Sequence, residues 1–434
     1  MKKKKANKRG NEFTVPPGVL DILNPQEPSI LPDEKIALRK EIHKKREKRR
    51  EKHHPGYFDI SPKWKLEPKD IEVCLGTALS TGEAIFWSPS RRRPKRLANA
   101  HILIVGKSGS GKTQTTMALI YEFFRCGVPS IVFDFHGEYV KEEFVKATKA
   151  KIIDANDGIK LNPLEIPYDP YTKQLQAHEK VIYQVSNSIS KICKLGVIQE
   201  SILREAMFEA FHQKGFSDRE VTLNFMAPTL NDVWDILLKK QREGDSNLKN
   251  LIARIDSIFG SRILSGGPRS FYFDDIISNV TILRLANLAT EELMIALSRF
   301  ILQKIYMNML MAGPSELFRI FCIIDEAHKL YGDRTLIHLI KETRKYGIGL
   351  ILSSQEARDF DSSMFSNTAT LICLQSGSAD AKKMAENIGL INKREINRAR
   401  KEMLRLTVGQ ALLKNDHYEP YTLIQINPFE HRIQ

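Results

Sequence analysis

The stretch HILIVGKSGSGKT, His101–Thr113, decides the fold of this chain. It opens with a short apolar run rich in β-branched side chains, which is typical of a buried parallel strand. The run leads into Gly106-Lys107-Ser108-Gly109-Ser110-Gly111-Lys112-Thr113, which matches the GxxxxGK[ST] pattern of phosphate-binding loops. Glycines let successive N–H groups point at phosphate oxygens, Lys112 is placed to reach the β- and γ-phosphates, and the Thr113 hydroxyl is a ligand for Mg²⁺.

The residues after this loop support the same interpretation. Met117, Ile120, Tyr121 and Phe124 recur at helical spacing, and Gly127 is placed to end the helix. The positive end of this helix would face bound phosphate. A glycine-rich turn that binds nothing is the alternative, and the flanking strand and helix argue against it. The sequence therefore predicts a nucleoside triphosphate site.

A second motif, FRIFCIIDEAHKL (Phe318–Leu330), supplies acidic groups. Ile320–Ile324 is an apolar run that predicts a buried strand, and it ends at Asp325 and Glu326. Ligands bind at the carboxyl ends of strands in open α/β sheets. We expect Asp325 to hold Mg²⁺ and Glu326 to orient or deprotonate the attacking water. Capping of the next helix by the two carboxylates is the alternative.

Two further strands end in polar groups. Ile348–Leu352 is followed by Ser353, Ser354 and Gln355, an amide that can report the γ-phosphate to the rest of the domain. Ser130–Phe135 contains Asp134 and is followed by Glu138; both carboxylates can support Mg²⁺, water or base positioning. In a parallel sheet we expect the polar end of this strand beside the phosphate-loop strand. Helix capping explains Asp134 equally well.

Composition constrains the partners and the compartment. The 434 residues are 42% hydrophobic, enough for a large core, and carry a net charge of +14, which points to a polyanionic partner such as nucleic acid or an anionic membrane. The five cysteines form no CxxC pair, so neither a zinc site nor a disulfide framework is indicated. We find no secretory signal, and the longest apolar stretch contains Arg299 and Lys304, which favours an amphipathic helix over a transmembrane segment. We expect a cytoplasmic protein.

The organisation along the chain is uneven. Residues 1–70 hold 19 Lys/Arg and 11 Asp/Glu, so we expect a basic, partly disordered arm with a helix over Lys35–Lys52. This arm fits a solubilising tail as well as a nucleic-acid contact. Residues 71–434 form the predicted ATPase domain, with a helical insertion over 168–270. Other predicted elements are a hairpin (Glu72–Leu79, Glu83–Trp87), a strand (Asn279–Leu285), a helix capped by Thr290, a helical segment (Asp380–Arg405) and two closing strands (Gly409–Lys414, Tyr421–Ile426).

Several of these stretches resemble the HerA/FtsK superfamily of P-loop motors, which includes HerA-like helicases and the ATPases of conjugation and type IV secretion. The resemblance covers residues 72 to 430 and includes the approach to the phosphate loop and the acidic motif. It is carried by ANAHILIVGKSGSGKT (Ala98–Thr113), IVFDFHGEY (Ile131–Tyr139), IKLNPLEIP (Ile159–Pro167), RIFCIIDEAHKL (Arg319–Leu330) and ETRKYGIGLILSSQ (Glu342–Gln355). Phe135 stands where the family usually has proline, Ser354 where it has threonine, and Glu356-Ala357 where Arg-Pro is common.

The resemblance implies an α/β fold of the RecA-like P-loop NTPase type, with a mainly parallel central sheet. It implies ATP and Mg²⁺ as ligands, Arg344 as an arginine finger that acts in a neighbouring subunit, Gln355 as the sensor, and a hexameric ring that pumps double-stranded DNA. For any single arginine an exposed side chain without a role is the alternative. HerA proteins also carry an N-terminal β-barrel, whereas residues 1–70 lack the alternation of strands.

Three functions share these motor motifs. The first is a ring-shaped, ATP-driven translocase or helicase on double-stranded DNA. The second is a conjugation or type IV secretion ATPase that works at a membrane complex. The third is a regulatory ATPase subunit of a nuclease or defence complex. Because the catalytic residues would be identical, the motifs favour ATP hydrolysis without choosing between the partners.

Overall fold

The computed structural model describes residues 69–433, apart from 93–94, 158, 160, 168, 170–175, 217–225, 245–246, 262, 265–276 and 331–333. All described residues belong to one compact unit, residues 59–434. The predicted basic arm, apart from Lys69 and Asp70, lies outside the described residues, and so does its helix over Lys35–Lys52.

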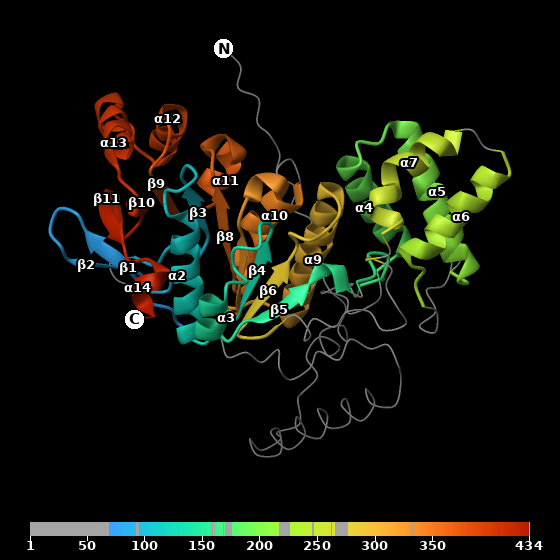
Figure 1. The fold of residues 1–434 in the computed structure, drawn as a ribbon, viewed down its shortest axis with the longest axis horizontal. Helices are drawn as coiled ribbons and strands as arrows, with labels where there is room; N and C mark the ends of the chain where they lie inside the picture. The colour runs from blue at the N-terminus through green and yellow to red at the C-terminus, as the bar shows by residue number, and fades with distance from the viewer. Residues whose placement is uncertain are drawn as a thin grey trace, which may run out of the picture. The chain divides into compact units, whose positions relative to one another are not determined.

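The described residues build one eleven-stranded sheet, in the order β2-β1-β11-β10-β9-β3-β8-β7-β4-β6-β5 (Figure 1). Seven neighbouring strands, from β9 to β5, run parallel. They are β3 (Ile102–Val105), β4 (Ser130–Asp134), β5 (Lys151–Asp154), β6 (Val280–Arg284), β7 (Ile320–Ile324), β8 (Ile348–Ser354) and β9 (Thr370–Leu374). The predicted α/β class with a mainly parallel sheet is confirmed.

The central strands are apolar on both faces because each lies between two cores. Successive strand side chains point to opposite faces. In β3, Leu103 and Val105 therefore join one core and Ile102 and Ile104 the other. Helix α2 (Lys112–Arg125) packs in the second core, where the Phe123 ring stacks on a ring of β7 with 4.0 Å between centroids. Helix α9 (Glu291–Ala312) contributes to the first core, and the Thr290 hydroxyl caps it as predicted by accepting the Leu293 N–H at 3.3 Å.

Antiparallel strands extend one side of the sheet. The predicted hairpin is present as β1 (Val73–Ala78) and β2 (Ala84–Trp87), and the closing strands as β10 (Gln410–Asn415) and β11 (Tyr418–Ile426). β1 pairs with β11, β11 with β10, and β10 with β9. The hairpin and the closing strands are therefore hydrogen-bonded in series to the parallel strands. The short helix α14 (Phe429–Arg432) then packs on α2.

Among the described residues between β5 and β6, four α-helices lie within the range of the predicted insertion. They are α4 (His178–Ile192), α5 (Val197–Gln213), α6 (Leu230–Arg242) and α7 (Asn247–Phe259). The predicted apolar stripe of α5 is buried, with Leu203, Met207, Ala210 and Phe211 in the same core as α9. Figure 1 shows these helices grouped at one end of the ribbon, beyond α9.

Other connections after the parallel strands are helical. α3 (Glu142–Thr148) follows β4, α10 (Arg334–Glu342) and the 3-10 turn η5 (Thr343–Tyr346) precede β8, and α11 (Ser362–Ser366) precedes β9. α12 (Ser378–Asn387) and α13 (Lys393–Arg405) divide the predicted helical segment after β9. Within the described part of the chain, no helix combines the length and the apolar character needed to cross a membrane.

One topological expectation is wrong. The strand that ends at Asp134 does not lie beside the phosphate-loop strand, because β8 and β7 separate β4 from β3. The sequence could show that both strands were buried, but it could not show that the later strands β7 and β8 insert between them.

Candidate active site

The phosphate loop joins β3 to α2, and its backbone packs closely against neighbouring side chains. A Cβ on Gly106 would lie 2.5 Å from Ser110 Oγ and 2.8 Å from Leu374 Cβ, so no larger residue fits. Gly111 has φ 101°, a left-handed conformation that glycine adopts without strain. Lys107, Ser108 and Gly109 form the exposed tip, and the first turn of α2 begins at Lys112.

Lys112 lies inside this loop rather than in solvent. Its Nζ donates hydrogen bonds to the carbonyl oxygens of Gly106, at 2.8 Å, and Lys107, at 3.3 Å. Burial lowers the pKa of Lys112, and the carboxylates of Asp325, Glu326 and Glu138 act in the opposite direction. The ammonium group of Lys112 is thus held inside the loop, where it could donate further hydrogen bonds to the oxygens of a polyphosphate.

The acidic pair ends β7 at the same edge of the sheet. Asp325 and Glu326 are both buried, and Glu326 has φ 63°, a left-handed conformation rare for a residue with a side chain. Asp325 Oδ2 accepts a hydrogen bond from the Tyr139 hydroxyl at 2.9 Å. Burial raises the pKa of Asp325, the neighbouring carboxylates of Glu326 and Glu138 raise it further, and the bond from Tyr139 opposes them.

Glu326 is surrounded by polar side chains from three segments. Its Oε1 accepts a hydrogen bond from Gln355 Nε2 at 3.2 Å, which joins the ends of β7 and β8. His328 Nδ1 lies 3.0 Å from Oε2, and His136 Nε2 lies 3.9 Å from Oε1. The predicted base and the predicted sensor are therefore in direct contact.

Asp134 organises the loop after β4. Its carboxylate accepts backbone N–H groups from His136 at 3.3 Å, Gly137 at 2.8 Å, Glu138 at 3.1 Å and Tyr139 at 3.2 Å. Burial raises the pKa of Asp134, and these four bonds oppose the increase. Both carboxylate oxygens are used in holding the loop, so Asp134 acts through the residues that it positions.

The loop that Asp134 holds spans the gap left by the two intervening strands. Glu138 Oε2 accepts a hydrogen bond from Thr113 Oγ1 at 2.5 Å, and Tyr139 reaches Asp325. The loop thus contacts the phosphate loop and the acidic motif at once. The sequence predicted only a supporting role for Glu138. In the structure, Glu138 is the residue of this loop that contacts Thr113, the predicted Mg²⁺ ligand.

Arg344 lies away from the other predicted residues. It is an exposed residue of η5, before β8 begins, whereas Gln355 directly follows the end of β8. The strand itself, Ile348–Ser354, is roughly 20 Å long at about 3.3 Å per residue. Arg344 is therefore at the opposite edge of the sheet from the phosphate loop of its own chain.

The residues at this edge fit a magnesium–nucleotide complex. Thr113, Asp325 and Glu138 supply the hard oxygen donors that Mg²⁺ prefers, and Lys112 supplies the cation for phosphate. Among the described residues, no group of three or more His, Cys, Asp or Glu side chains forms an all-protein metal site. Mg²⁺ that is held partly by phosphate oxygens requires only one or two protein ligands.

Three contacts of this site were not predicted from the sequence: those of Tyr139, His136 and His328. Tyr139 and His136 lie in the stretch IVFDFHGEY, and His328 is the third residue after Asp325, so the motifs contained them. Their roles depend on how the β4 loop crosses two strands, which no local pattern specifies. Of the three departures from the family pattern, Phe135 is buried in the first core, the Ser354 hydroxyl donates to Asp359, and Glu356 pairs with Arg358.

Comparisons with solved structures agree with this architecture. The structure of VirB4 of Thermoanaerobacter pseudethanolicus superimposes with a TM-score of 0.67 at 20% identity, over 83% of this chain and 98% of that chain. The plasmid coupling protein TrwB in complex with ADP and Mg²⁺ gives a TM-score of 0.52 at 13% identity, over 86% and 97%. At these identities the likeness shows the fold, and the RecA-like P-loop prediction is confirmed.

Sequence comparisons give the family. The DNA double-strand break repair helicase HerA of Sulfurisphaera tokodaii is 23% identical over 353 residues, 77% of this chain and 66% of that protein. The chain thus spans slightly less than two thirds of the length of the curated relatives it matches. Residues 252–410 match the type IV secretion-system coupling protein DNA-binding domain. Residues 73–305, more than half of the chain, match the central domain of helicase HerA, and the chain belongs to that family.

Proposed function

We propose that this chain is an ATP-hydrolysing motor that moves along double-stranded DNA as a ring, most simply a hexamer. The observation that carries the proposal is the convergence of four strand ends at one sheet edge. Thr113 contacts Glu138, Asp325 contacts Tyr139, and Glu326 contacts Gln355. These contacts join the segments after β3, β4, β7 and β8 into one site.

Each residue of the site has a distinct task in hydrolysis. Lys112 and the loop N–H groups hold the β- and γ-phosphates, and Thr113 and Asp325 hold Mg²⁺, which when bound neutralises charge on the phosphate oxygens. Glu326 orients the attacking water and takes up its proton, and Gln355 holds the Glu326 carboxylate at 3.2 Å. Asp134 fixes the loop that carries Glu138 and Tyr139.

The position of Arg344 supports a ring. Because β8 separates Arg344 from the site of its own chain, the guanidinium cannot stabilise transition-state charge there. In a ring, the end of the sheet that carries Arg344 would face the phosphate loop of the neighbouring subunit. The guanidinium would then act in trans on the phosphates bound there, as arginine fingers do. Arg344 is exposed, as an intersubunit role requires.

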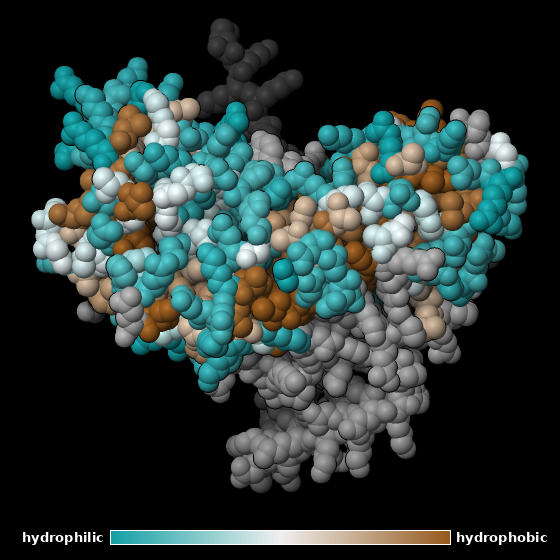
Figure 2. All heavy atoms as spheres, viewed as in Figure 1, coloured by the Kyte–Doolittle hydropathy of each residue, from teal (hydrophilic) through white to brown (hydrophobic). Residues whose placement is uncertain are grey.

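Surface charge supports a nucleic-acid substrate. Helix α13 comes after β9 in the chain, and β9 ends on the side of the sheet that carries the phosphate loop. The cations that α13 exposes are Lys393, Arg394, Arg398, Lys401 and Arg405. Figure 2 shows hydrophilic side chains gathered over α12 and α13. Of these cations Arg398 pairs with Glu402 at 2.9 Å. Cations on one helix bind phosphates without reading sequence.

The test is ATP turnover with and without long double-stranded DNA, measured together with particle size by sedimentation. We expect duplex to stimulate turnover, and the stimulation to fall steeply between about 50 and about 200 mM salt because binding releases counterions. Turnover that is indifferent to duplex at low salt would remove the DNA-motor assignment.

A second candidate is an ATPase of the conjugation or secretion type at a membrane complex, or one that regulates a nuclease. The match of residues 252–410 to a type IV secretion-system domain favours keeping it. For this candidate, the same turnover measurement should give a different result. ATP hydrolysis would still depend on Lys112, but a partner complex or membranes would stimulate it and duplex DNA would not.

A further inference from the structure

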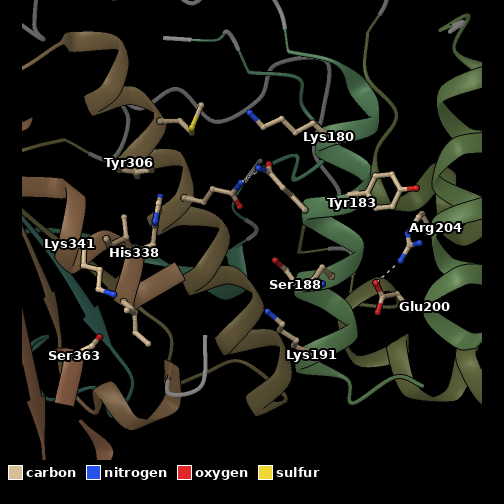
Figure 3. Close-up of a pocket in the computed structure, with 16 residues that line it drawn as sticks. Lys180, Tyr183, Ser188, Lys191, Glu200, Arg204, Tyr306, His338, Lys341 and Ser363 are labelled. Atoms are coloured by element: carbon tan, nitrogen blue, oxygen red, sulfur yellow. Dashed lines mark hydrogen bonds and ion pairs between the residues drawn. The ribbon is translucent and has the colours of Figure 1, made fainter. Parts of the chain in front are cut away.

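A groove of about 960 Å³ lies between the helical insertion and the α9–α10 side of the ATPase core (Figure 3). One wall is formed by α4 and α5, and the other by α9 and α10 with Ser363 of α11. It lies outside the nucleotide site, and none of the residues discussed above lines it. The lining combines an excess of positively charged side chains with polar and apolar ones.

The α4 wall is one continuous helical face. Its lining residues recur at helical spacing: Lys180, Tyr183, Gln184, Asn187, Ser188 and Lys191. The opposite face of α4 is buried in the core through Val181, Ile182, Val185 and Ile189. A polar outer face by itself is what any surface helix shows, so the helix alone does not indicate a ligand.

The second wall supplies the further observation. His338 and Lys341 of α10 line the same groove as Lys180 and Lys191, and Figure 3 shows them on the side that faces α4. Lys180, Lys191 and Lys341 form no ion pair within 4.0 Å among the described residues. Elsewhere on the insertion, Lys214 and Lys240 are each paired with a carboxylate, at 2.9 and 2.7 Å.

An aromatic ring lies on the α5 side of the groove, where Figure 3 shows Tyr183 directed away from Lys341 and towards Arg204. Tyr183 is 53% exposed, and the guanidinium of Arg204, itself paired with Glu200 at 2.6 Å, lies 4.6 Å from the ring centroid. The groove thus holds a half-exposed ring and unpaired lysines, the two kinds of group that single-strand-binding grooves use, with bases on aromatic rings and phosphates on cations. Apolar side chains also line the groove, namely those of Met307, Ile337 and Leu339.

We propose that this groove binds a single strand of nucleic acid, with its phosphates on Lys180, Lys191 and Lys341 and a base against Tyr183. In a duplex the bases are stacked inside the helix and cannot reach the ring, so the strand must be unpaired. The inference rests on the proposed function because it adds a second, single-strand site to a DNA motor.

The groove is connected to the element that carries Arg344. His338 Nε2 lies 3.5 Å from Glu342 Oε2, and the Tyr306 hydroxyl donates to the same carboxylate. The Tyr306 ring also contacts Tyr346, with 6.4 Å between centroids, and Tyr346 belongs to the 3-10 turn of Arg344. These contacts link His338 and Tyr306 of the groove lining to the 3-10 turn that contains Arg344.

The experiment measures binding of a labelled oligothymidylate by fluorescence anisotropy, without nucleotide, so that it does not depend on ATP hydrolysis. The test variant is Lys180→Glu/Lys191→Glu. The control is Lys239→Glu/Lys249→Glu, which reverses two lysines on α6 and α7 of the same insertion, outside the groove lining. We expect affinity to fall at least about tenfold in the test variant only, and the slope of log K against log salt to flatten by about 1.4, for two lost phosphate contacts.

Tyr183 gives a second measurement. Tyr183→Ala should weaken binding about 5- to 100-fold, as loss of one stacked base does, whereas Tyr183→Phe keeps the ring and should bind as the wild type does. Equal affinity of the wild type and both lysine variants for the oligothymidylate would overturn the proposal.

Two other outcomes would also overturn it. If the groove variant loses its oligomeric size in sedimentation while the control keeps it, the groove is a subunit contact. If the groove variant loses affinity for a duplex of equal length but not for the single strand, the lysines belong to a duplex path. Duplex-stimulated turnover of the wild type tests the proposed function separately, so the two failures are distinguishable.

Discussion

Glu326 adopts a left-handed backbone conformation at the point where β7 ends. A residue with a side chain in this region costs about 1–3 kcal/mol, and such strain persists where surrounding contacts fix it. Here the side chain is fixed by Gln355, with His328 and His136 close by. These contacts hold the Glu326 carboxylate at the carboxyl end of β7, where its charge acts on Lys112 of the phosphate loop.

Tyr139 should govern the affinity of the site for Mg²⁺. The Tyr139→Phe variant keeps the buried ring and removes the hydrogen bond to Asp325, so the Asp325 carboxylate loses a contact that opposes the rise of its pKa. We expect the Mg²⁺ concentration for half-maximal ATP turnover to increase about 10- to 100-fold, as for other residues that hold a metal ligand.

Tyr121→Phe on α2 is the matched control, because that ring packs against Phe429 and lies outside the site. An unchanged Mg²⁺ midpoint in Tyr139→Phe would show that Asp325 does not hold the metal.

At the scale of elements, β3 and β8 are joined through a buried histidine at the start of β3. His101 Nδ1 accepts the Leu350 N–H at 3.1 Å, one residue before the parallel pairing of Ile102 with Ile351. Burial, and to a smaller extent the positive charge of Arg344, lower the pKa of His101 to about 4. The strand that leads to the phosphate loop is thereby anchored to the strand that leads to Gln355.

His101 should make the protein sensitive to acid. The unfolded chain takes up a proton near pH 6.5 and the folded chain only near pH 4, so this stability is present above pH 6.5 and is lost as the pH falls from 6.5 to 4. His101→Gln, whose amide oxygen can accept the Leu350 N–H, should reduce that loss by about 3 kcal/mol in urea unfolding. The exposed His431→Gln is the control, and equal pH slopes for all three proteins would contradict the prediction.

Gly349 shows how closely β8 and β7 pack. A Cβ at this position would lie 2.1 Å from Cε1 of Phe321, whose ring is stacked on Phe123. Gly349→Ala should therefore destabilise the protein by about 1–3 kcal/mol, the usual cost of overpacking a core. Gly196→Ala, whose Cβ would meet one side-chain atom at 3.9 Å, is the control in urea unfolding. A Gly349→Ala variant as stable as the control would show that Phe321 moves freely.

The elements differed in how far the sequence could predict them. β3, β7 and β8 were predictable because unbroken apolar runs lead into polar motifs, and helix α9 because Thr290 precedes two glutamates. β5 was not predicted, because this strand has only four residues and none of them is fully buried. The order of strands was not predictable either, because it depends on which strands hydrogen-bond along their edges, and the central strands are all buried and apolar.

At the scale of the whole molecule, the predicted site residues lie at both ends of the parallel strands. The phosphate loop and acidic motif lie at the carboxyl edge, and Arg344 lies at the other. In the proposed ring, a site would be complete only when a neighbouring subunit contributes the end of its sheet that carries Arg344. The predicted strand Ile348–Leu352 already separated Arg344 from Gln355 in the sequence, and the structure places the two residues at opposite ends of β8.

Mixing subunits should reveal this division. Arg344→Ala should bind ATP normally and lose about 10³-fold or more in turnover, as removal of an arginine finger does. Lys112→Ala should be inactive as well. A mixture of the two variants should recover part of the activity, because some interfaces combine an intact phosphate loop with an intact finger. A mixture no more active than either variant would show that Arg344 does not act in trans.

The central claim is that Lys112 and Glu326 serve one nucleotide, the first in binding and the second in hydrolysis. The most direct measurement is of ATP affinity and ATP turnover together in Lys112→Ala and Glu326→Gln. We predict that Lys112→Ala loses both, whereas Glu326→Gln keeps its affinity and loses about 10²- to 10⁴-fold in turnover. Wild-type turnover in either variant would contradict the account.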